Sequence, residues 1–285
     1  MPRQQRRRRR LGTSISVLFL VALAVATYLV VRQVKPLLTG TGCQAVAGRV
    51  TMPLDTEQAG IAATIAGVAH QRGLPPRAVT VAYAAALQES KMHNLDYGDR
   101  DSVGVFQQRP SEGWGPRRKL EDPVFATTRF FQVLITVPGY RHLPVYKAAQ
   151  AVQHSADGAA YSQYQGQAGR LARAFTGQQA RAVWCWSPSA AAGRAKLGAA
   201  SQALAVTFGP VHGRQADPPA VGRALLVRAH GQAMGWAVAA WLVTHAQQYR
   251  IHQVRFAGYQ WLASTGTSGW KRVAGASRPG SVQAS

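Results

Sequence analysis

The residues best suited to acid–base chemistry in this chain are its carboxylates, and there are few of them. Only 11 of the 285 residues are Asp or Glu, against 33 Lys and Arg. Seven of the 11 fall in one stretch: Glu89, Asp96, Asp99, Asp101, Glu112, Glu121 and Asp122. A carboxyl group transfers protons effectively when its surroundings are partly apolar. This stretch is therefore the first place to expect catalysis, and a charge-balanced loop is the alternative interpretation.

Glu89 is the strongest single candidate for a general acid. It shares one face of a predicted helix with Ala82, Ala85 and Ala86, so its carboxyl group leaves the helix end over small apolar residues. Fifteen residues later comes Gly104-Val105-Phe106-Gln107, followed by Pro110. A glutamate near a helix end is more often simply solvated, so Glu89 is a catalytic candidate only in combination with this second segment.

Glu89-Ser90 followed by Gly104 to Gln107 and Pro110 resembles the soluble lytic transglycosylase family of the lysozyme-like superfamily. The longer run from Asn94 to Gly115 is similar to an actinobacterial subgroup of membrane-anchored cell-wall proteins. The resemblance covers about residues 54–175 and implies a lysozyme-like fold. It also implies cleavage of the MurNAc-GlcNAc β-1,4 bond of peptidoglycan, with Glu89 acting first as acid and then as base.

The resemblance further implies roles for the residues around Glu89. Ser90 is expected to orient the carboxylate, while Gly104, Phe106 and Gln107 are expected to contact the glycan. Trp114 is expected to stack on a sugar, with ordinary loop packing as the alternative.

The family's downstream A-Y-N-x-G element is absent from this chain, and residues 151–156 occupy its place. Gln153 or Ser155 is expected to substitute for it, or Tyr161 to reach into the cleft. The missing element leaves open a second function, a non-catalytic peptidoglycan-binding or scaffold protein of a cell-envelope assembly.

Asp99 and Asp101 have two interpretations. One of them could be the second carboxylate of an inverting hydrolase, or both could fix the loop through hydrogen bonds and pairs with Arg100 and Arg109. We favour the structural interpretation. The register of a calcium loop is absent, and we expect neither a metal nor a cofactor.

Helices are needed to position these residues, and the apolar spacing predicts them over 54–71, 77–91, 122–137, 144–153 and 161–175. The glycine- and aspartate-rich stretch 93–115 is predicted to be an ordered loop between the second and third of these helices.

The N-terminal 35 residues hold eight basic residues and no acid. Residues 11–31 carry no charge and are long enough to form a transmembrane helix. Six cations precede this segment, so residues 1–10 are expected to be cytoplasmic, residues 32–43 a linker, and the globular part extracellular on the cell membrane. A cleaved signal peptide is the competing interpretation.

Cys43 and Cys185 are the two cysteines of the chain. In an extracellular protein they are expected to form a disulfide, with two buried free thiols as the alternative. Their positions suggest a lysozyme-like domain over 44–186, followed by a linker over 187–201 that is rich in Ala, Gly, Ser and Pro.

The C-terminal residues 202–285 are predicted to form a basic accessory domain of α+β type. We expect a helix over 232–249, strands at 224–229, 251–256, 259–263 and 270–273, and irregular structure over the last dozen residues. The run from Trp241 to Trp270 is distantly similar to zinc D-Ala-D-Ala carboxypeptidases. The ligands of those enzymes are missing, so His230, His245 and His252 are expected to be packing or surface residues.

The fold predicted from the sequence is an N-terminal transmembrane helix, a mainly α lysozyme-like domain and a small α+β C-terminal domain. The net charge of +22 suggests anionic partners. We expect peptidoglycan glycan strands, anionic wall polymers and cell-envelope machinery as partners, beside the membrane. Nucleic acid is not expected, because positive-inside topology explains the basic N-terminal segment more simply.

Overall fold

A computed structural model describes Thr27 and residues 40–154, 158–187, 193–210, 213–216, 224–274 and 280–285. By its contacts, the chain from Thr41 to Ser285 forms one compact unit. The predicted transmembrane segment, residues 11–31, lies outside the described residues except for Thr27. Within the described part of the chain, no helix is both long and apolar enough to span a membrane.

The first sheet has three antiparallel strands and was not predicted. Its strands β1 (Gly42–Ala47), β2 (Val50–Leu54) and β3 (Val183–Trp186) lie in the order β2-β1-β3. Gly48 makes the turn between β1 and β2 with a φ of +61°, a conformation that glycine adopts without steric cost. The sheet brings the two ends of the helical segment together, because Cys43 on β1 lies opposite Cys185 on β3.

The helices between β2 and β3 begin and end at identifiable residues. Asp55 caps the first helix through a capping box with Gln58, and Pro76 opens the second one, where its missing N–H costs nothing. These helices, with η denoting 3₁₀ turns, are α2 (Thr56–Gln71), α3 (Pro76–Glu89), η1 (Pro110–Glu112), α4 (Arg117–Leu120), α5 (Pro123–Leu134), α6 (Val145–Gln153), η2 (Gly158–Tyr164) and α7 (Gln165–Phe175).

The second sheet is larger and lies in the C-terminal part of the chain. Its six strands are all antiparallel to their neighbours, in the order β4-β5-β9-β6-β7-β8. The hairpin of β6 and β7 turns at Ala257-Gly258, as the sequence predicted, and both residues have positive φ. The strands are β4 (Gly213–Ala216), β5 (Ala224–Arg228), β6 (Gln253–Phe256), β7 (Tyr259–Leu262), β8 (Lys271–Arg272) and β9 (Ser281–Ala284).

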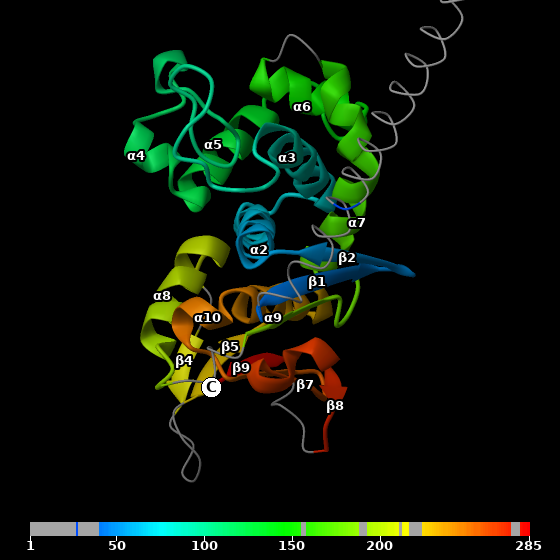
Figure 1. Ribbon diagram of the computed structural model, residues 1–285, viewed down its shortest axis with the longest axis vertical. Coiled ribbons are helices and arrows are strands. Elements are labelled where there is room, and N and C mark those ends of the chain that lie inside the picture. Colours follow the sequence, from blue (N-terminus) through cyan, green and yellow to red (C-terminus); the bar gives the residue numbers. More distant parts are fainter. Residues whose placement is uncertain are drawn as a thin grey trace, which may run out of the picture. The chain divides into compact units, whose positions relative to one another are not determined.

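Helix α9 (Gln232–Thr244) lies between the helices of the first half and the large sheet (Figure 1). It packs against α2 as well as against β6 and β9, and every residue from Gly235 to Thr244 is buried. Helix α8 (Leu197–Phe208) also packs on α2 and begins inside the predicted linker 187–201. The short helix α10 (Ala246–Tyr249) and the 3₁₀ turn η4 (Ala263–Ser268) complete the fold.

The predicted fold class is therefore wrong. In place of a mainly α domain followed by a small α+β domain, the chain has an α+β fold with two antiparallel sheets among its described residues. The missed sheet is built from three short strands, and the paired residues of β1 and β3 are 138 to 144 positions apart in sequence, from Ala45 with Val183 to Gly42 with Trp186, so no local pattern indicates this pairing. The last strand, β9, lies inside the large sheet, with Val282 and Ala284 fully buried, where irregular structure was expected.

Candidate active site

Glu89 is the last residue of α3, and its side chain is half-buried. The neighbours on its face of the helix, Ala82, Ala85 and Ala86, are fully buried, as the helical spacing predicted. The carboxylate therefore leaves the end of α3 at the border between an apolar core and solvent. This border is where a carboxylic acid can reach an external substrate and still be held in one orientation.

The hydroxyl of Tyr161 donates a hydrogen bond of 2.6 Å to Oε1 of Glu89. Tyr161 lies on η2 and is 1% exposed, so its ring is fixed by the core and its hydroxyl by the carboxylate. Oε2 of Glu89 has no hydrogen-bond partner in the part of the chain that the structure describes. Tyr161 thus fixes Oε1 of the carboxylate, while Oε2 stays available to a substrate.

Two further contacts fasten η2 to the end of α3. The Lys91 ammonium donates to the Tyr164 hydroxyl at 2.6 Å and lies 4.8 Å from the centre of its ring. The side-chain amide of Gln163 donates to that of Gln88 at 3.3 Å. Lys91 also places a positive charge near the C-terminal end of α3. The helix dipole is negative at that end and stabilises a cation there.

Ser90 is buried and connects Glu89 to the segment Gly104 to Gln107. Its hydroxyl donates to the carbonyl oxygen of Val105 at 2.8 Å and accepts a hydrogen bond from the backbone N–H of His93 at 3.1 Å. Ser90 is only 6% exposed, so it serves as a positioning residue beneath Glu89 and does not face a ligand.

Gly104, Phe106 and Gln107 have different roles in this segment. Gly104 has a φ of +80°, and a Cβ atom there would lie 2.4 Å from the carbonyl oxygen of Leu120. Phe106 is completely buried and stacks on Phe130 with 4.6 Å between ring centres, so its ring is part of the core. The amide of Gln107 donates to the carbonyl oxygens of Tyr97 and Gly104, at 3.2 and 3.1 Å.

Gln153 lies next to this segment, although it is the last residue of α6. Its side-chain nitrogen donates to the Phe106 carbonyl at 2.6 Å, while its side-chain oxygen is buried without a partner among the described residues. Gln153 and Tyr161, two of the residues considered as substitutes for the missing element, thus contact the Phe106 carbonyl oxygen and the Glu89 carboxylate. Ser155, the other residue considered for this role, lies outside the described residues.

Trp114 and Asp101 have structural roles in this arrangement, while Asp99 lies at the surface. Trp114 is 8% exposed, so its indole packs inside the protein. Asp101 accepts hydrogen bonds from the backbone N–H of Ser111 at 2.8 Å and from the Arg109 guanidinium at 3.0 Å. The Ser111 N–H and the Arg109 guanidinium lower the pKa of Asp101 to about 2. Asp99 is 92% exposed and lies 4.0 Å from Arg100.

Sequence reasoning missed one contact that holds the loop after Glu89. His93 forms a 2.9 Å ion pair with Asp55, the residue that caps α2. The carboxylate of Asp55 raises the pKa of His93 mainly through this hydrogen bond. A separation of 38 residues gives no local signal for the pair.

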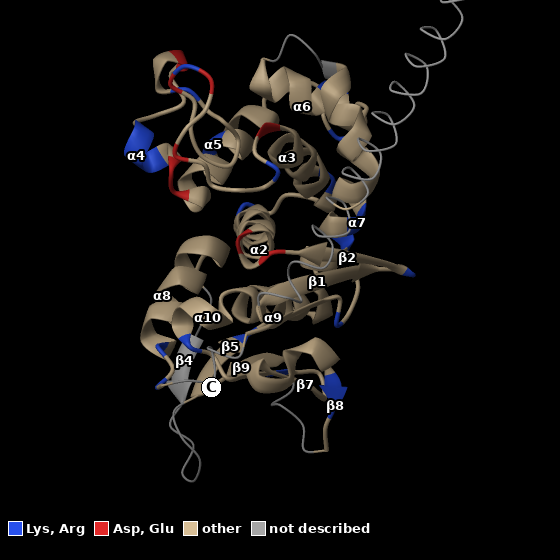
Figure 2. Ribbon diagram, in the orientation of Figure 1, with Lys and Arg blue, Asp and Glu red and all other residues tan. Residues whose placement is uncertain are grey.

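Figure 2 shows the acidic residues gathered mostly along the loop that follows α3, while basic residues are distributed over both halves of the chain. A disulfide joins Cys43 to Cys185 across the first sheet. Of the three C-terminal histidines, His245 stacks on Trp241, His252 contacts the Gly193 carbonyl oxygen at 2.9 Å, and His230 is exposed. Among the described residues, no group of three His, Cys, Asp or Glu side chains is arranged to hold a metal ion.

The candidate site therefore consists of Glu89 with Tyr161, held by a frame in which Ser90, Gln107 and Gln153 contact one segment of backbone. Comparison with known proteins adds no identity to this geometry: no protein-family model matches the chain, and no curated protein matches it.

Proposed function

We propose that this protein cleaves peptidoglycan glycan strands at the MurNAc-GlcNAc β-1,4 bond, with Glu89 as the proton donor. The observation that supports this proposal is the half-buried carboxylate at the end of α3, with Oε1 bonded to Tyr161 and Oε2 without a described partner. The substrate lies outside the cell membrane, so the proposed place of action is extracellular.

The proposed reaction needs only one carboxyl group. Protonated Glu89 gives its proton to the glycosidic oxygen while the bond between that oxygen and C1 of the muramyl residue breaks. The N-acetyl group of the same sugar can stabilise the cationic carbon. Glu89, now a carboxylate, then accepts the proton of the C6 hydroxyl as that oxygen bonds to C1. The product carries a 1,6-anhydro ring, no water is consumed, and Glu89 is protonated again.

Tyr161 has a positioning role in this scheme. Its hydroxyl bonds Oε1, which leaves Oε2 to carry the proton toward the substrate and to receive it back. The bond also stabilises the carboxylate in the second step, because hydrogen bonds to a charged group are about twice as strong as those between neutral groups.

Asp101 is not a good second carboxylate for a hydrolase. Both of its oxygens accept hydrogen bonds within its own loop, from Ser111 and Arg109. These bonds favour a structural role for Asp101 and support transglycosylation by a single glutamate over hydrolysis by two carboxylates.

Purified full-length chain, kept in mild detergent because residues 11–31 are apolar, would be incubated with peptidoglycan and the products identified by mass spectrometry. We expect 1,6-anhydro ends from the wild type and a loss of at least about a hundredfold in rate for Glu89→Gln, the lower end of the usual contribution of a general acid. Tyr161→Phe is expected to keep part of the activity. Asp99→Asn, a change at an exposed carboxylate, is the matched control and should leave the rate unchanged.

Reducing ends in place of anhydro ends would identify a hydrolase, and the absence of products would refute both enzymatic versions. The non-catalytic peptidoglycan-binding or scaffold protein remains the second candidate because the A-Y-N-x-G element of the family is absent from residues 151–156. Peptidoglycan binding that persists without any product, in the wild type and in Glu89→Gln alike, would favour it.

A further inference from the structure

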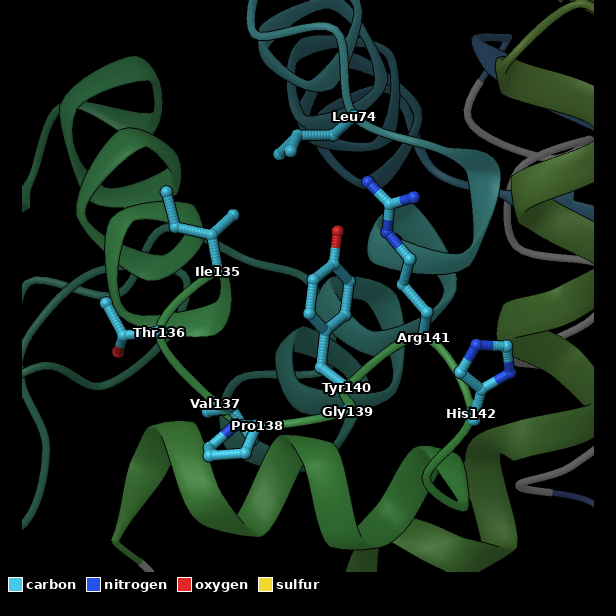
Figure 3. Close-up of a pocket in the computed structure, with 9 residues that line it drawn as sticks. All are labelled: Leu74, Ile135, Thr136, Val137, Pro138, Gly139, Tyr140, Arg141 and His142. Carbon is cyan, nitrogen blue, oxygen red and sulfur yellow. The ribbon is translucent and has the colours of Figure 1, made fainter.

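A pocket lies at the opposite end of α3 from Glu89. It is lined by Leu74, just before α3, and by residues 135–142 between α5 and α6 (Figure 3). Its volume of about 420 Å³ is within the range of small-ligand pockets. The 14 residues of α3 separate it from Glu89 by about 20 Å, so this Tyr140 pocket is distinct from the candidate active site.

The hydroxyl of Tyr140 is the unusual feature of the pocket. Tyr140 is 7% exposed, and its hydroxyl has no hydrogen-bond partner among the residues that the structure describes. Figure 3 shows this hydroxyl pointing across the pocket toward Leu74. A buried hydroxyl without a partner is costly and rare, so its presence needs an explanation. A ligand that accepts its hydrogen bond supplies one.

The surroundings of this hydroxyl are positively charged. The Arg141 guanidinium lies 6.0 Å from the centre of the Tyr140 ring, and its side chain runs beside Tyr140 toward the same space (Figure 3). Arg141 forms no ion pair with any described acid, and residues 135–143 contain no Asp or Glu. The pocket also adjoins the N-terminal, partly positive end of α3. Arg77 in the first turn of α3 donates to the Leu143 carbonyl oxygen and ties the loop to that end.

The walls of the pocket are apolar. Leu74 and Val137 are partly buried against the core, and Ile135 is 48% exposed, so its apolar surface is accessible to a ligand. A free phosphate would gain nothing from these walls, and a sugar would bring no charge to Arg141. The ligand that matches both features carries a negative group beside a small apolar body.

We propose that the Tyr140 pocket binds the C-terminal carboxylate of a short peptide with small apolar side chains. The carboxylate accepts a hydrogen bond from the Tyr140 hydroxyl and pairs with Arg141, while the side chains of the peptide contact Leu74 and Ile135. This site is independent of the proposed glycan cleavage, because it requires neither Glu89 nor an active enzyme.

Binding would be measured on the full chain by saturation-transfer NMR with three probes: acetyl-alanyl-alanine, its C-terminal amide, and inorganic phosphate. We expect saturable binding of the free acid and binding of the amide at least about tenfold weaker, since a hydrogen bond to a charged group contributes that factor or more. Tyr140→Phe and Arg141→Gln are each expected to weaken binding of the acid by a similar factor. Tyr97→Phe and Arg118→Gln, at exposed positions elsewhere, are the matched controls.

The thermal stability of Tyr140→Phe separates a ligand site from a structural hydroxyl. Without ligand this variant should melt at the same temperature as the wild type or higher, because a buried polar group without a partner has been removed. Equal binding of acid and amide, no saturable binding of the acid, unchanged binding in both variants, phosphate binding as tight as the acid, or a clearly lower melting temperature of Tyr140→Phe would each overturn the proposal.

Discussion

The ion pair between Asp55 and His93 should stabilise the loop that follows Glu89, and its contribution can be separated from that of the α2 cap. Asp55 accepts a 2.8 Å hydrogen bond from the backbone N–H of Gln58 through Oδ1, and it contacts His93 at 2.9 Å through Oδ2. Asn caps a helix about as well as Asp does. Asp55→Asn therefore removes the charge and keeps the cap, whereas Asp55→Ala removes both.

The expected magnitudes follow from the exposure of the pair. The side chains of His93 and Asp55 are 30% and 47% exposed, so we expect Asp55→Asn to lower the free energy of unfolding by about 0.5–1 kcal/mol, as for other solvent-accessible ion pairs. Asp55→Ala should lower it by about 1 kcal/mol more, the usual contribution of an N-cap. Equal losses in the two variants would show that the charge, and not the cap, accounts for the stabilisation by Asp55.

The pH dependence of the pair has a definite sign. The hydrogen bond from Asp55 raises the pKa of His93 above 6.5, so this stabilisation is complete below pH 6.5 and is lost as the pH rises through the higher, folded-state pKa. Burial tends to raise the pKa of Asp55, but hydrogen bonds from His93 and Gln58 outweigh it and lower that pKa below 3.8. The stabilisation by Asp55 is therefore lost only as the pH falls through this lower value. The pair should be strongest between about pH 4 and pH 6.5.

A double-mutant cycle with Asp55→Asn and His93→Gln, measured by urea unfolding, gives the coupling energy directly. We expect about 0.5–1 kcal/mol near pH 5.5 and close to zero near pH 9, where His93 is neutral. His142→Gln, at an exposed histidine, is the control and should show no coupling with Asp55→Asn. A coupling energy that is absent near pH 5.5, or equal at the two pH values, would refute the reasoning.

Three further predictions concern the disulfide, the buried His245 and Gly104 beside the candidate site. Replacing Cys43 and Cys185 together by Ser should lower the free energy of unfolding by about 4–5 kcal/mol, because their disulfide closes a loop of 142 residues; chemical denaturation without reductant measures this, and a loss below about 1 kcal/mol would contradict it. Burial lowers the pKa of His245 to about 4 in the folded protein. As the pH drops from 6.5 to 4, the imidazole of His245 is therefore protonated in the unfolded chain before it is protonated in the folded one. The free energy of unfolding of the wild type should fall by at most about 3 kcal/mol over this range. His245→Phe should reduce this fall, and an unchanged pH profile would show that His245 is not its source. Gly104→Ala should lower the free energy of unfolding by about 2 kcal/mol or more and slow glycan cleavage, because the residue has a φ of +80° and its Cβ would meet the Leu120 carbonyl oxygen. A variant with the melting temperature and the cleavage rate of the wild type would exclude a strained contact at this position.

Local patterns predicted the helices because each carries its own signals. The expected helices 54–71 and 144–153 agree with α2 and α6 to within two residues at each end. The β6-β7 hairpin was equally predictable, since both its strands and its Ala257-Gly258 turn are contiguous in sequence. These elements depend on interactions between residues a few positions apart, which is the information that periodicity and capping residues contain.

The sheets could not be predicted in the same way, because their pairings join distant segments. Strand β3 pairs with β1 at a separation of 142 residues for Cys43 and Cys185, and β9 lies between β5 and β6 although it is the last element of the chain. Helix α8 was missed because its first residues continue the Ala- and Gly-rich composition of the expected linker. In the candidate site, the position of Glu89 follows from helical spacing. Its contact with Tyr161 joins residues 72 positions apart, so the sequence offered Tyr161 only as one alternative beside Gln153 and Ser155.

The surroundings of Glu89 change what its neighbours can be expected to do. The consecutive carbonyl oxygens of Gly104, Val105 and Phe106 accept hydrogen bonds from Gln107, Ser90 and Gln153. Three side chains of the candidate site are thus engaged in holding one backbone segment beside α3. A substitution at any of them should act by displacing Glu89 and its bond to Tyr161, because a misplaced acid loses transition-state stabilisation. Such a substitution lowers kcat with little change in KM, whereas loss of a sugar-binding group would raise KM, so the two parameters separate a frame from a binding surface.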